Sequence, residues 1–472
     1  MKMKELGEWY IQVIREAELA DYGPSKGDIV LMPNGMSLWN SILSAISGLI
    51  EERGYRQAYF PLLIPREFIE REMKQFSSLS PRLYEARRAN ADEQESTMVI
   101  RPTSETVINS MFAKWIDSYR DLPMKVFQAS NIVRWEEVTH PFLKSREILW
   151  LEGHTIHETE EQAEEEIIKM RNDLLRFFQT VLAIPVFFGV EPESRKFVGS
   201  RKTITFETIA PNGKALQIGA LYDLGQVFSR MFSVQYRNRK NELAYCWGIN
   251  WGIGFRLVGA LALIHGDERG LVIPPRVAPV QAVILPVMGK NCSREELIPA
   301  IRTANDTLIA ANVRTQVCTE TTGSVKGDLV YWEKRGVPLI ILVGKKEAEE
   351  SCVTLLRRDA TIGSNKQTVS IAQISRIVPV LLKKAQRDMF MAAQERINGL
   401  RCESLFGEAL ADSLENTWGV VYWCAEKACE QNVVNGYGKI IKCILPDEVP
   451  AHAHCVFCGK PACFKAVIAK TF

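Results

Sequence analysis

Arginines recur in three separated segments that also carry glutamates, and this combination can bind anions. The segments are 101–106 (RPTSET), 134–154 (RWE at the start, WLEGH at the end) and 256–270, which opens on an arginine and closes on HGDERG. A guanidinium group stays charged and offers planar pairs of donors, so it suits carboxylates and phosphates. A single arginine or glutamate in a strand is usually part of a surface ion pair. The meaning of the three segments therefore depends on whether they act together.

Cysteines near the end of the chain have the spacing of a metal site. Six of the eleven cysteines lie between Cys424 and Cys463, and a disulfide framework is unusual in so large a chain. The pairs Cys424-x4-Cys429 and Cys455-x2-Cys458 offer four thiolates to a tetrahedral Zn²⁺ ion. Buried thiols without a metal are the alternative, and none of these cysteines has the setting of a nucleophile. Nearby groups that could substitute as ligands are Cys443, Cys463, His452 and His454.

The length and composition are those of an ordinary globular protein with two or three domains. The chain has 472 residues, of which 46% are hydrophobic and 24% charged, enough for a sizeable core. A net charge of +2 neither requires nor excludes a nucleic-acid partner, because binding needs only a local basic patch. No run reaches the roughly 18 apolar residues of a membrane span, and residues 1–23 are typical of an amphipathic helix rather than a signal peptide. We therefore expect a cytoplasmic protein without a membrane partner.

The elements that must position these residues follow from apolar periodicity. In the first part of the chain we expect helices at 8–20, 36–53 and 158–181 and strands at 58–64, 126–133, 147–152, 203–209 and 244–248. This order is typical of a mixed α/β domain around an antiparallel sheet.

Prolines at 274, 275 and 279 indicate a domain boundary. Beyond them, strands expected at 280–287, 315–320, 338–344 and 352–358 alternate with helices and predict a small α/β domain with a largely parallel sheet. Residues 381–420 are expected to be helical, and 421–472 form the cysteine-rich end. We therefore divide the chain into domains at 1–275, 276–380 and 381–472.

Taken together, the three segments resemble the class II prolyl-tRNA synthetases of the archaeal and eukaryotic type. The family has RPTSET, RWE followed by REFLWQEGHT, and SWG followed by R and HGDDRGLVLPP. This chain has RPTSETV at 101–107, RWEEVTHPFLKSREILWLEGHT at 134–155 and NWGIGFRLVGALALIHGDERGLVIPP at 250–275, with ELADYGP at 18–24 and AYFPLLIP at 58–65. The resemblance covers nearly the whole chain. It implies an α/β (α+β) fold with an antiparallel-sheet catalytic domain, a small α/β anticodon-binding domain and a C-terminal zinc-binding α/β domain.

The resemblance implies ATP-dependent activation of an amino acid, in which the substrate carboxylate attacks the α-phosphorus and pyrophosphate leaves. Charge builds on the phosphoryl oxygens, so catalysis is positioning and electrostatics. Arg134 would bridge the α-phosphate and the carboxylate, while Arg146 and Arg256 would hold the outer phosphates and the adenine face. Arg134 and Arg256 would therefore be the catalytic residues. Glu207 and Gln217 would position ATP, or Mg²⁺ through oxygen ligands, and Glu136 is implied to bind ATP.

The resemblance also implies an amino-acid pocket. A carboxylate that faces an ammonium group is the expected way to select an amino acid, and Thr103 and Glu105 would lie near the amine. The other residues implied around the pocket are Arg134, Trp150, Glu152, His154, Tyr222 and Asn250. An ordinary core position is the alternative for Trp150.

Two partners follow from the same resemblance. Pro61 lies where class II enzymes have the motif of their dimer interface, so a homodimer is implied; alone, Pro61 would be only a proline at a strand edge. The nucleic-acid partner would be a tRNA, either tRNA-Pro or a variant of it.

Departures from the family pattern lie in functional places. The Thr-Ser-His triplet that lines the family's proline pocket is Ala220-Leu221-Tyr222 here, its serine before Trp-Gly is Asn250, and one phenylalanine is Ile148. Each change alters size or hydrogen bonding near the substrate, and one unmatched buried group costs about 1–3 kcal/mol.

The second group of departures concerns the anticodon-binding domain. The arginine and glutamate that read anticodon bases in relatives are Ile340 and Leu342. Base-edge readout requires polar groups, which aliphatic side chains lack.

Three functions remain open at this point. The first is a proline–tRNA ligase with altered anticodon recognition, which the presence of all three domains favours. The second is a paralogue that adenylates a different amino acid or loads a non-tRNA acceptor such as a carrier protein, which the changed pocket favours. The third is a non-catalytic binding protein on this fold. Against it stand the intact Arg134, Glu136, Arg146, Glu207 and Arg256.

Overall fold

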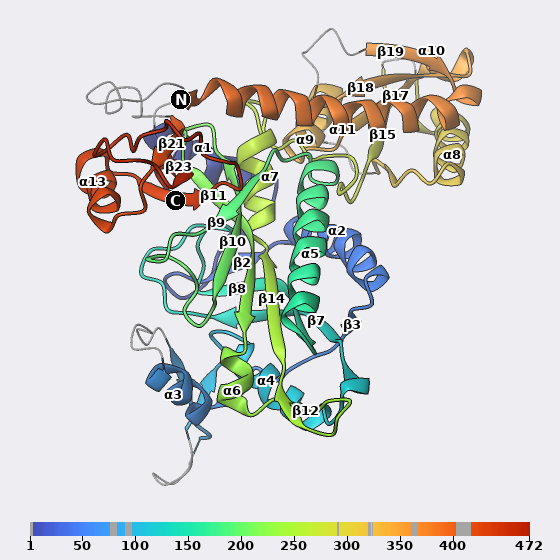
Figure 1. Ribbon diagram of the computed structural model, residues 1–472. Helices are drawn as coiled ribbons and strands as arrows, with labels where there is room; N and C mark the ends of the chain where they lie inside the picture. Colours follow the sequence, from blue (N-terminus) through green and yellow to red (C-terminus); the bar gives the residue numbers. More distant parts are fainter. Residues whose placement is uncertain are drawn as a thin grey trace.

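Figure 1 shows a molecule in three parts, arranged around a long central sheet. The structure is a computed structural model that describes residues 3–75, 83–89, 97–289, 292–319, 322, 324–359, 366–402 and 417–472. Among these residues, no helix combines the length and the apolar character that crossing a membrane requires.

An antiparallel sheet forms the centre of the first part. Its strands follow the order β9-β10-β11-β14-β8-β7, and every neighbouring pair is antiparallel, with β3 as a short parallel edge. The expected antiparallel sheet is therefore confirmed. The strands are β3 (Arg56–Gln57), β7 (Met124–Val133), β8 (Glu147–His157), β9 (Phe187–Val190), β10 (Lys202–Ile209), β11 (Ala215–Gly225) and β14 (Trp247–Gly254).

Helices cover one face of this sheet. α5 and α7 pack on its strands, α1 and α2 pack on α7, and their buried side chains share one apolar core with the sheet. α5 begins after Thr159, whose side chain accepts a hydrogen bond from the Gln162 N–H, as favourable caps do. The helices are α1 (Met3–Glu16), α2 (Pro33–Glu52), α5 (Glu160–Thr180) and α7 (Arg256–His265).

The opposite face of the sheet is the polar one, because residues alternate between the faces of a strand. On β14, Ile249, Trp251 and Ile253 belong to the core under the helices, whereas Asn250 and Gly252 lie on the other side. One end of this second face is closed by α4, α6 and a small sheet with the order β4-β6-β5 (Figure 1). The bounds are β4 (Leu63–Pro65), α3 (Arg66–Gln75), β5 (Tyr84–Ala86), β6 (Met98–Ile100), α4 (Glu105–Trp115) and α6 (Val227–Phe232).

The strand expected at 58–64 is wrong over most of its length. β3 ends at Gln57 and β4 begins only at Leu63. Between them, the carbonyl oxygens of Phe60 and Pro61 accept hydrogen bonds from the Arg101 guanidinium group. A buried side chain therefore satisfies backbone groups that a strand would have used in a ladder.

The second part of the molecule is a five-stranded sheet in the order β16-β15-β17-β18-β19. β15 pairs in parallel with both β16 and β17. β18, however, is antiparallel to β17, and β19 is antiparallel to β18. The predicted largely parallel sheet is thus half correct, because apolar periodicity does not specify strand direction. The elements are β15 (Ala282–Val287), α8 (Arg294–Ala310), β16 (Thr315–Val317), α9 (Val325–Lys334), β17 (Leu339–Gly344), α10 (Lys345–Glu349), β18 (Cys352–Arg357) and β19 (Lys366–Ser370).

α11 (Ile374–Gly399) runs from the second part to the third (Figure 1). It ends at Gly399, and β20 (Arg401–Cys402) follows. The helix predicted for 381–420 is therefore wrong at 401–402 and again at 418–420, where a strand begins, and residues 403–416 lie outside the described part of the chain.

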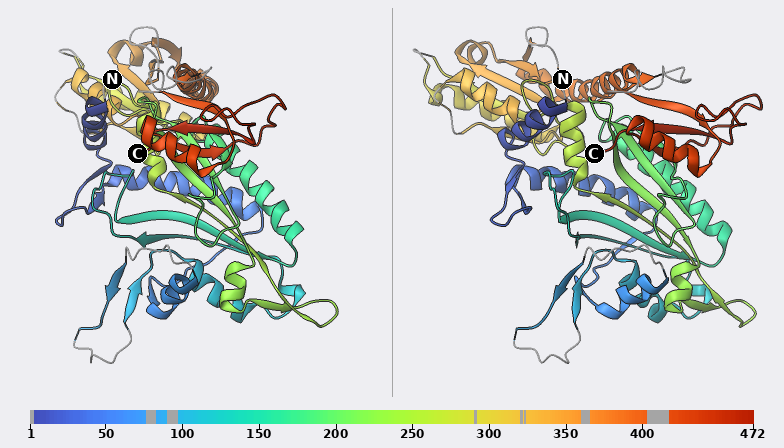
Figure 2. Two further views of the ribbon diagram at one scale, coloured as in Figure 1. Left: turned by 60° about the vertical axis from the view of Figure 1, so that its left-hand side comes forward. Right: turned by 90° about the vertical axis from the view of Figure 1, so that its left-hand side faces the viewer.

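The third part continues the central sheet. Its strands follow the order β20-β21-β23-β22, and β22 pairs with β9 through Ile444 and Val190. In Figure 2 this C-terminal region lies directly beside the end of the central sheet. Its elements are β21 (Trp418–Trp423), α13 (Lys427–Tyr437), β22 (Ile440–Ile444) and β23 (Phe464–Ala469).

Candidate active site

Strand register brings the predicted pocket residues onto one face of the sheet. Asn250 lies opposite His154 on β8 and opposite Tyr222 on β11. Two residues further along β14, Gly252 lies opposite Glu152 and Ala220. A side chain at Gly252 would meet the ring of Trp150, because an added Cβ would be 3.0 Å from Trp150 Cζ3. The glycine therefore lets the indole lie flat on the floor of the site.

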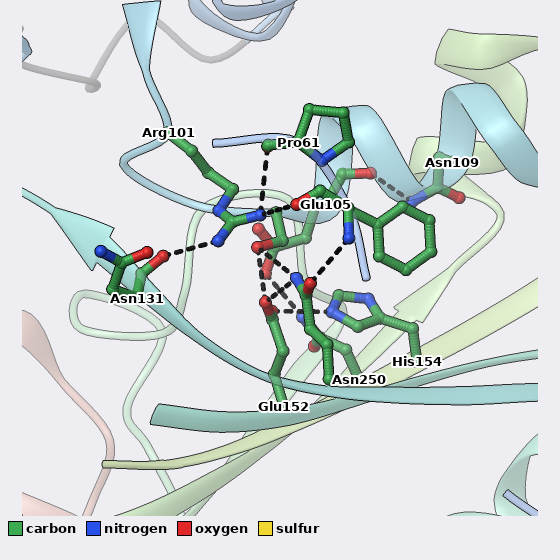
Figure 3. A network of polar contacts seen from close by, with 11 residues as sticks. Pro61, Arg101, Glu105, Asn109, Asn131, Glu152, His154 and Asn250 are labelled. Carbon is green, nitrogen blue, oxygen red and sulfur yellow. Dashed lines mark hydrogen bonds and ion pairs between the residues drawn. The ribbon is translucent and has the colours of Figure 1, made fainter. Parts of the chain in front are cut away.

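Glu152 is the centre of a buried polar network, shown in Figure 3. Its carboxylate accepts hydrogen bonds from Ser104 Oγ at 2.5 Å and from Gln128 Nε2 at 2.7 Å, and it lies 2.9 Å from His154 Nε2. Burial alone would raise the pKa of Glu152, but His154 and then the Ser104 and Gln128 bonds lower it below its usual value. Glu152 is therefore a fixed anion that orients its neighbours.

Glu105 differs from Glu152, because only one of its two carboxylate oxygens has a hydrogen-bond partner among the described residues. Asn250 Nδ2 donates to Glu105 Oε1 at 2.6 Å, while Glu105 Oε2 is buried and has no hydrogen-bond partner among the described residues. Burial raises the pKa of this carboxyl group, and a bound cation would offset that cost.

Other buried polar atoms of the predicted pocket residues also lack partners within the described residues. An unmatched buried polar atom costs about 1–3 kcal/mol, so several in one place indicate a site that a ligand completes. These atoms are Thr103 Oγ1, Trp150 Nε1 and Asn250 Oδ1.

Arg101 supports this end of the site from behind. Its fully buried guanidinium group donates to Phe60 O at 2.8 Å, Pro61 O at 3.1 Å and Asn131 O at 2.7 Å (Figure 3). It therefore ties the segment before β4 to β7 and holds the loop that carries Thr103 and leads into α4, whose first residue is Glu105.

A cavity of about 240 Å³ opens beside the network. Its walls carry guanidinium, carboxylate and amide groups together with aromatic rings, so it suits a ligand with both charged and planar parts. The predicted site residues that line it are Arg134, Glu136, Trp150, Gln217, Tyr222 and Arg256.

The three predicted arginines are each anchored by backbone carbonyl groups. Arg134 Nε donates to Pro102 O, and Arg256 donates through Nε to Leu143 O and through Nη1 to Gln217 O. Arg146 donates to Glu136 O, and its guanidinium lies 4.2 Å from the centre of the exposed Trp135 ring. Arg134 and Arg256 line the cavity, whereas Arg146 supports the neighbouring segment.

Glu207 lies behind the cavity rather than in its wall. It is fully buried, and Thr205 Oγ1 donates to its Oε1 at 2.7 Å. Gln217 Nε2 donates in turn to Thr205 Oγ1 at 2.8 Å. Lys442 Nζ, from β22, lies 3.1 Å from the same Glu207 oxygen. Burial raises the pKa of Glu207, and Lys442 opposes that rise.

The four predicted metal ligands converge. Their Sγ atoms all lie within 4.8 Å of one another, and three of the separations are 3.6, 3.7 and 4.0 Å. Zn–S bonds of about 2.3 Å in a tetrahedron place sulfurs about 3.8 Å apart, so the geometry fits Zn²⁺. The set is Cys424, Cys429, Cys455 and Cys458, without the alternatives Cys443, Cys463, His452 or His454.

Comparison with known proteins decides the family. A model of the tRNA synthetase class II core domain (G, H, P, S and T) matches residues 84–265, and one of the anticodon binding domain matches 281–380. A proline–tRNA ligase from Symbiobacterium thermophilum is 38% identical over 97% of this chain and 95% of its own length. Another, from Borreliella burgdorferi, is 35% identical over 100% and 99%. The chain belongs to the prolyl-tRNA synthetase family.

Solved members of the prolyl-tRNA synthetase family have the same fold. The enzyme from Cryptosporidium parvum complexed with halofuginone and AMPPNP matches with a TM-score of 0.93 at 30% identity, covering 100% of this chain and 98% of that one. Its complex with L-proline and AMP matches with a TM-score of 0.92 at 30% identity, covering 99% and 95%. The predicted family and three-part fold are therefore confirmed.

The departures from the prolyl-tRNA synthetase pattern occupy different environments. Ala220, Tyr222 and Ile148 line the cavity, and Asn250 bonds Glu105. Leu221 does not line it, because it points to the opposite face of β11 and is buried in the helix-covered core. The prediction that all three residues of the triplet alter the pocket is wrong for Leu221.

In the anticodon-binding domain, Ile340 is 2% exposed. It belongs to an apolar cluster with Trp332 and Val283, and the partly buried Leu342 packs against that cluster. Both positions therefore contribute to packing of the sheet rather than to a polar surface.

Several site residues were missed by reasoning from sequence. Ser104 and Gln128 bond Glu152, and Lys442 pairs with Glu207. The available signals were a glutamine inside the apolar run KVFQAS and a lysine inside IIKCIL. A polar residue within a buried strand is usually paired, but the pattern does not name its partner.

Proposed function

We propose that this chain is a proline–tRNA ligase that activates proline with ATP as prolyl-adenylate and transfers it to tRNA. The main support is the cavity whose wall carries Arg134 and Arg256, together with the half-satisfied Glu105 carboxylate in the buried network beside it. Such a site accepts an anionic phosphate at one end and a cationic amine at the other. Membership of the prolyl-tRNA synthetase family supports the same conclusion.

The roles of the side chains follow from their charges. Glu105 and Thr103 bind the substrate amine, with Glu152, His154, Trp150, Tyr222 and Asn250 shaping the pocket. Arg134 holds the carboxylate against the α-phosphate, so that its oxygen attacks phosphorus and pyrophosphate leaves. Arg146 and Arg256 bind the phosphates and the adenine face, and fixed guanidinium groups stabilise the developing charge.

Two metal ions complete the proposal. Mg²⁺ would neutralise phosphate charge, with Glu207 and Gln217 positioning Mg²⁺ or ATP and Glu136 at the ATP site. Glu207 Oε2 is buried and has no hydrogen-bond partner among the described residues, which fits this assignment. Zn²⁺ would be structural, held by the four converging thiolates.

We further place the domain boundaries at 1–275, 276–380 and 381–472, as catalytic, anticodon-binding and zinc-binding domains. The first boundary falls between the two matched family models, which end at 265 and begin at 281. The partners we propose are tRNA-Pro or a variant of it and a second copy of the chain, with Pro61 at the interface.

ATP–pyrophosphate exchange with purified protein and each common amino acid tests the activation step. We expect proline to support exchange at least about tenfold better than any other amino acid. Exchange driven by a different amino acid would contradict the proposal.

A second candidate, activation of a different amino acid or a non-tRNA acceptor, draws support from the changed pocket. The Tyr222 ring lies 4.9 Å from that of Phe197, and Asn250 occupies one oxygen of Glu105. The triple variant A220T/Y222H/N250S restores the family residues. If its preference among amino acids equals that of the original chain, the pocket argument for this candidate fails.

A further inference from the structure

The C-terminal region contributes a charged side chain to the nucleotide end of the site. Lys442 lies on β22, and its ammonium group is 3.1 Å from Glu207 Oε1. The exposed fractions of the two side chains are 5% and 0%. A buried charge without a partner is strongly unfavourable, so this pair is a built feature rather than a surface contact.

The pair connects to groups that line the cavity. Glu207 is linked through Thr205 to Gln217, whose backbone oxygen accepts from Arg256 Nη1. The other oxygen of Glu207 is buried without a partner among the described residues. Lys442 therefore occupies one oxygen of a carboxylate whose second oxygen remains for a ligand.

Lys442 is itself positioned by the zinc-binding fold. Its neighbour Ile441 belongs to the apolar cluster that contains Cys424, Cys429 and Cys455. Its other neighbour, Cys443, packs with Ile209 and Ala215 of the catalytic sheet. β22 thus has one residue packed on the cysteine cluster and one packed on the catalytic sheet, with Lys442 between them.

We propose that the zinc-binding region completes the nucleotide end of the active site through Lys442, a positioning residue that holds the Glu207 carboxylate. Loss of the Lys442 charge weakens ATP binding and leaves proline binding unchanged. Loss of zinc has the same selective effect, because it displaces β22. The inference depends on the proposed function only in treating Glu207 as an ATP-site residue.

Calorimetric titration of full-length protein with AMPPNP and Mg²⁺, and separately with proline, tests whether Lys442 supports ATP binding selectively. We expect K442M to weaken AMPPNP binding at least about tenfold and to change proline affinity less than twofold, while K442R stays within about threefold of the original chain for both. Zinc content, measured on the same samples, should remain one ion per chain in both variants.

Lys439 offers a matched control in the same region. It is also buried, but its ammonium group donates to Thr417 O at 2.7 Å, away from Glu207. K439M should lower the melting temperature and leave AMPPNP affinity within twofold. If K442M does not fold, K442Q replaces it, since glutamine keeps a donor without the charge.

Equal AMPPNP affinity in K442M and the original chain would overturn the inference, as would equal weakening of AMPPNP and proline. A similar loss of AMPPNP affinity in K439M would also overturn it, because the effect would then be general destabilisation. No AMPPNP binding by the original chain would overturn both the inference and the proposed function.

Discussion

At the proposed amino-acid end of the site, Glu105 and Glu152 are held by side chains of the central sheet and the loop before α4. At the proposed nucleotide end, Glu207 is paired with Lys442 of the C-terminal region. The first end is assembled within one domain. The second depends on how two domains pack. Amino-acid binding should therefore tolerate disturbance of the zinc region better than ATP binding does.

The largest effect is expected at Arg256. Arg256→Ala removes a fixed guanidinium group from the cavity wall, and we expect proline-dependent exchange to fall by about 10²–10³ in kcat/KM. Arg256→Lys should also be severely impaired, because lysine lacks the planar pair of donors. Arg230 of α6 donates a hydrogen bond to Gln226. Arg230→Ala is the control and should retain activity. A loss below about threefold in R256A would remove this residue from the reaction.

Glu105→Gln separates the two ends of the site. Loss of the negative charge should raise KM for proline by about 10- to 100-fold, because a charge-assisted hydrogen bond to the amine is weakened. KM for ATP should change less than twofold, measured in the same exchange assay. The exposed Glu137, changed to Gln, serves as control. If both KM values rose together in E105Q, the ends would not be separable.

Acid should destabilise the folded chain through His265, the last residue of α7, the helix that begins with Arg256. Burial lowers the pKa of His265 from 6.5 to about 4, and its Nε2 lies 3.0 Å from Leu182 O. The unfolded chain therefore binds the proton more tightly, and stability present above pH 6.5 is lost as pH falls toward 4. The loss amounts to about 3 kcal/mol at 1.36 kcal/mol per unit.

Urea unfolding between pH 7 and 4 measures this effect. His265→Gln should be less stable at pH 7 but should depend less on pH than the original chain. The exposed His140, changed to Gln, should leave the pH dependence as it was. An unchanged pH dependence in H265Q would show that His265 does not titrate on unfolding.

The smallest effect is expected in a third region, the anticodon-binding sheet. Ile340 is buried in an apolar cluster and Leu342 packs against it, so neither reads a base edge. Replacing an anticodon base of the tRNA should lower kcat/KM for charging less than about threefold, whereas a lost direct contact costs about 1–3 kcal/mol. A loss of 100-fold or more would mean that other residues of this domain read the anticodon.

The sequence predicts the residues of the proposed amino-acid end of the site better than those of the proposed nucleotide end. Residues at the proposed amino-acid end lie in contiguous motifs, so the resemblance predicted Glu105, Glu152 and His154 together, before any coordinates. Period-two alternation then places them on one face of the sheet. Lys442 could not be assigned in this way, because its partner lies in a distant part of the sequence and the pairing depends on how β22 meets β9.

The errors of the sequence prediction have physical reasons. Residues 58–62 are apolar enough for a strand. The buried Arg101 guanidinium group, however, donates hydrogen bonds to the carbonyl oxygens of Phe60 and Pro61. Leu221 was assigned to the pocket with its neighbours, although adjacent residues on a strand face opposite sides. The prediction missed that β18 runs antiparallel to β17 and that β19 runs antiparallel to β18, because apolar spacing does not encode the direction of a strand.

Transfer of labelled proline to tRNA is the most direct test of the central claim, that this chain is a proline–tRNA ligase. With ATP, Mg²⁺, purified protein and tRNA-Pro, we predict acid-precipitable label that disappears when ATP is omitted. Proline-dependent exchange without any label on tRNA would contradict the claim and would indicate a different acceptor for the activated amino acid.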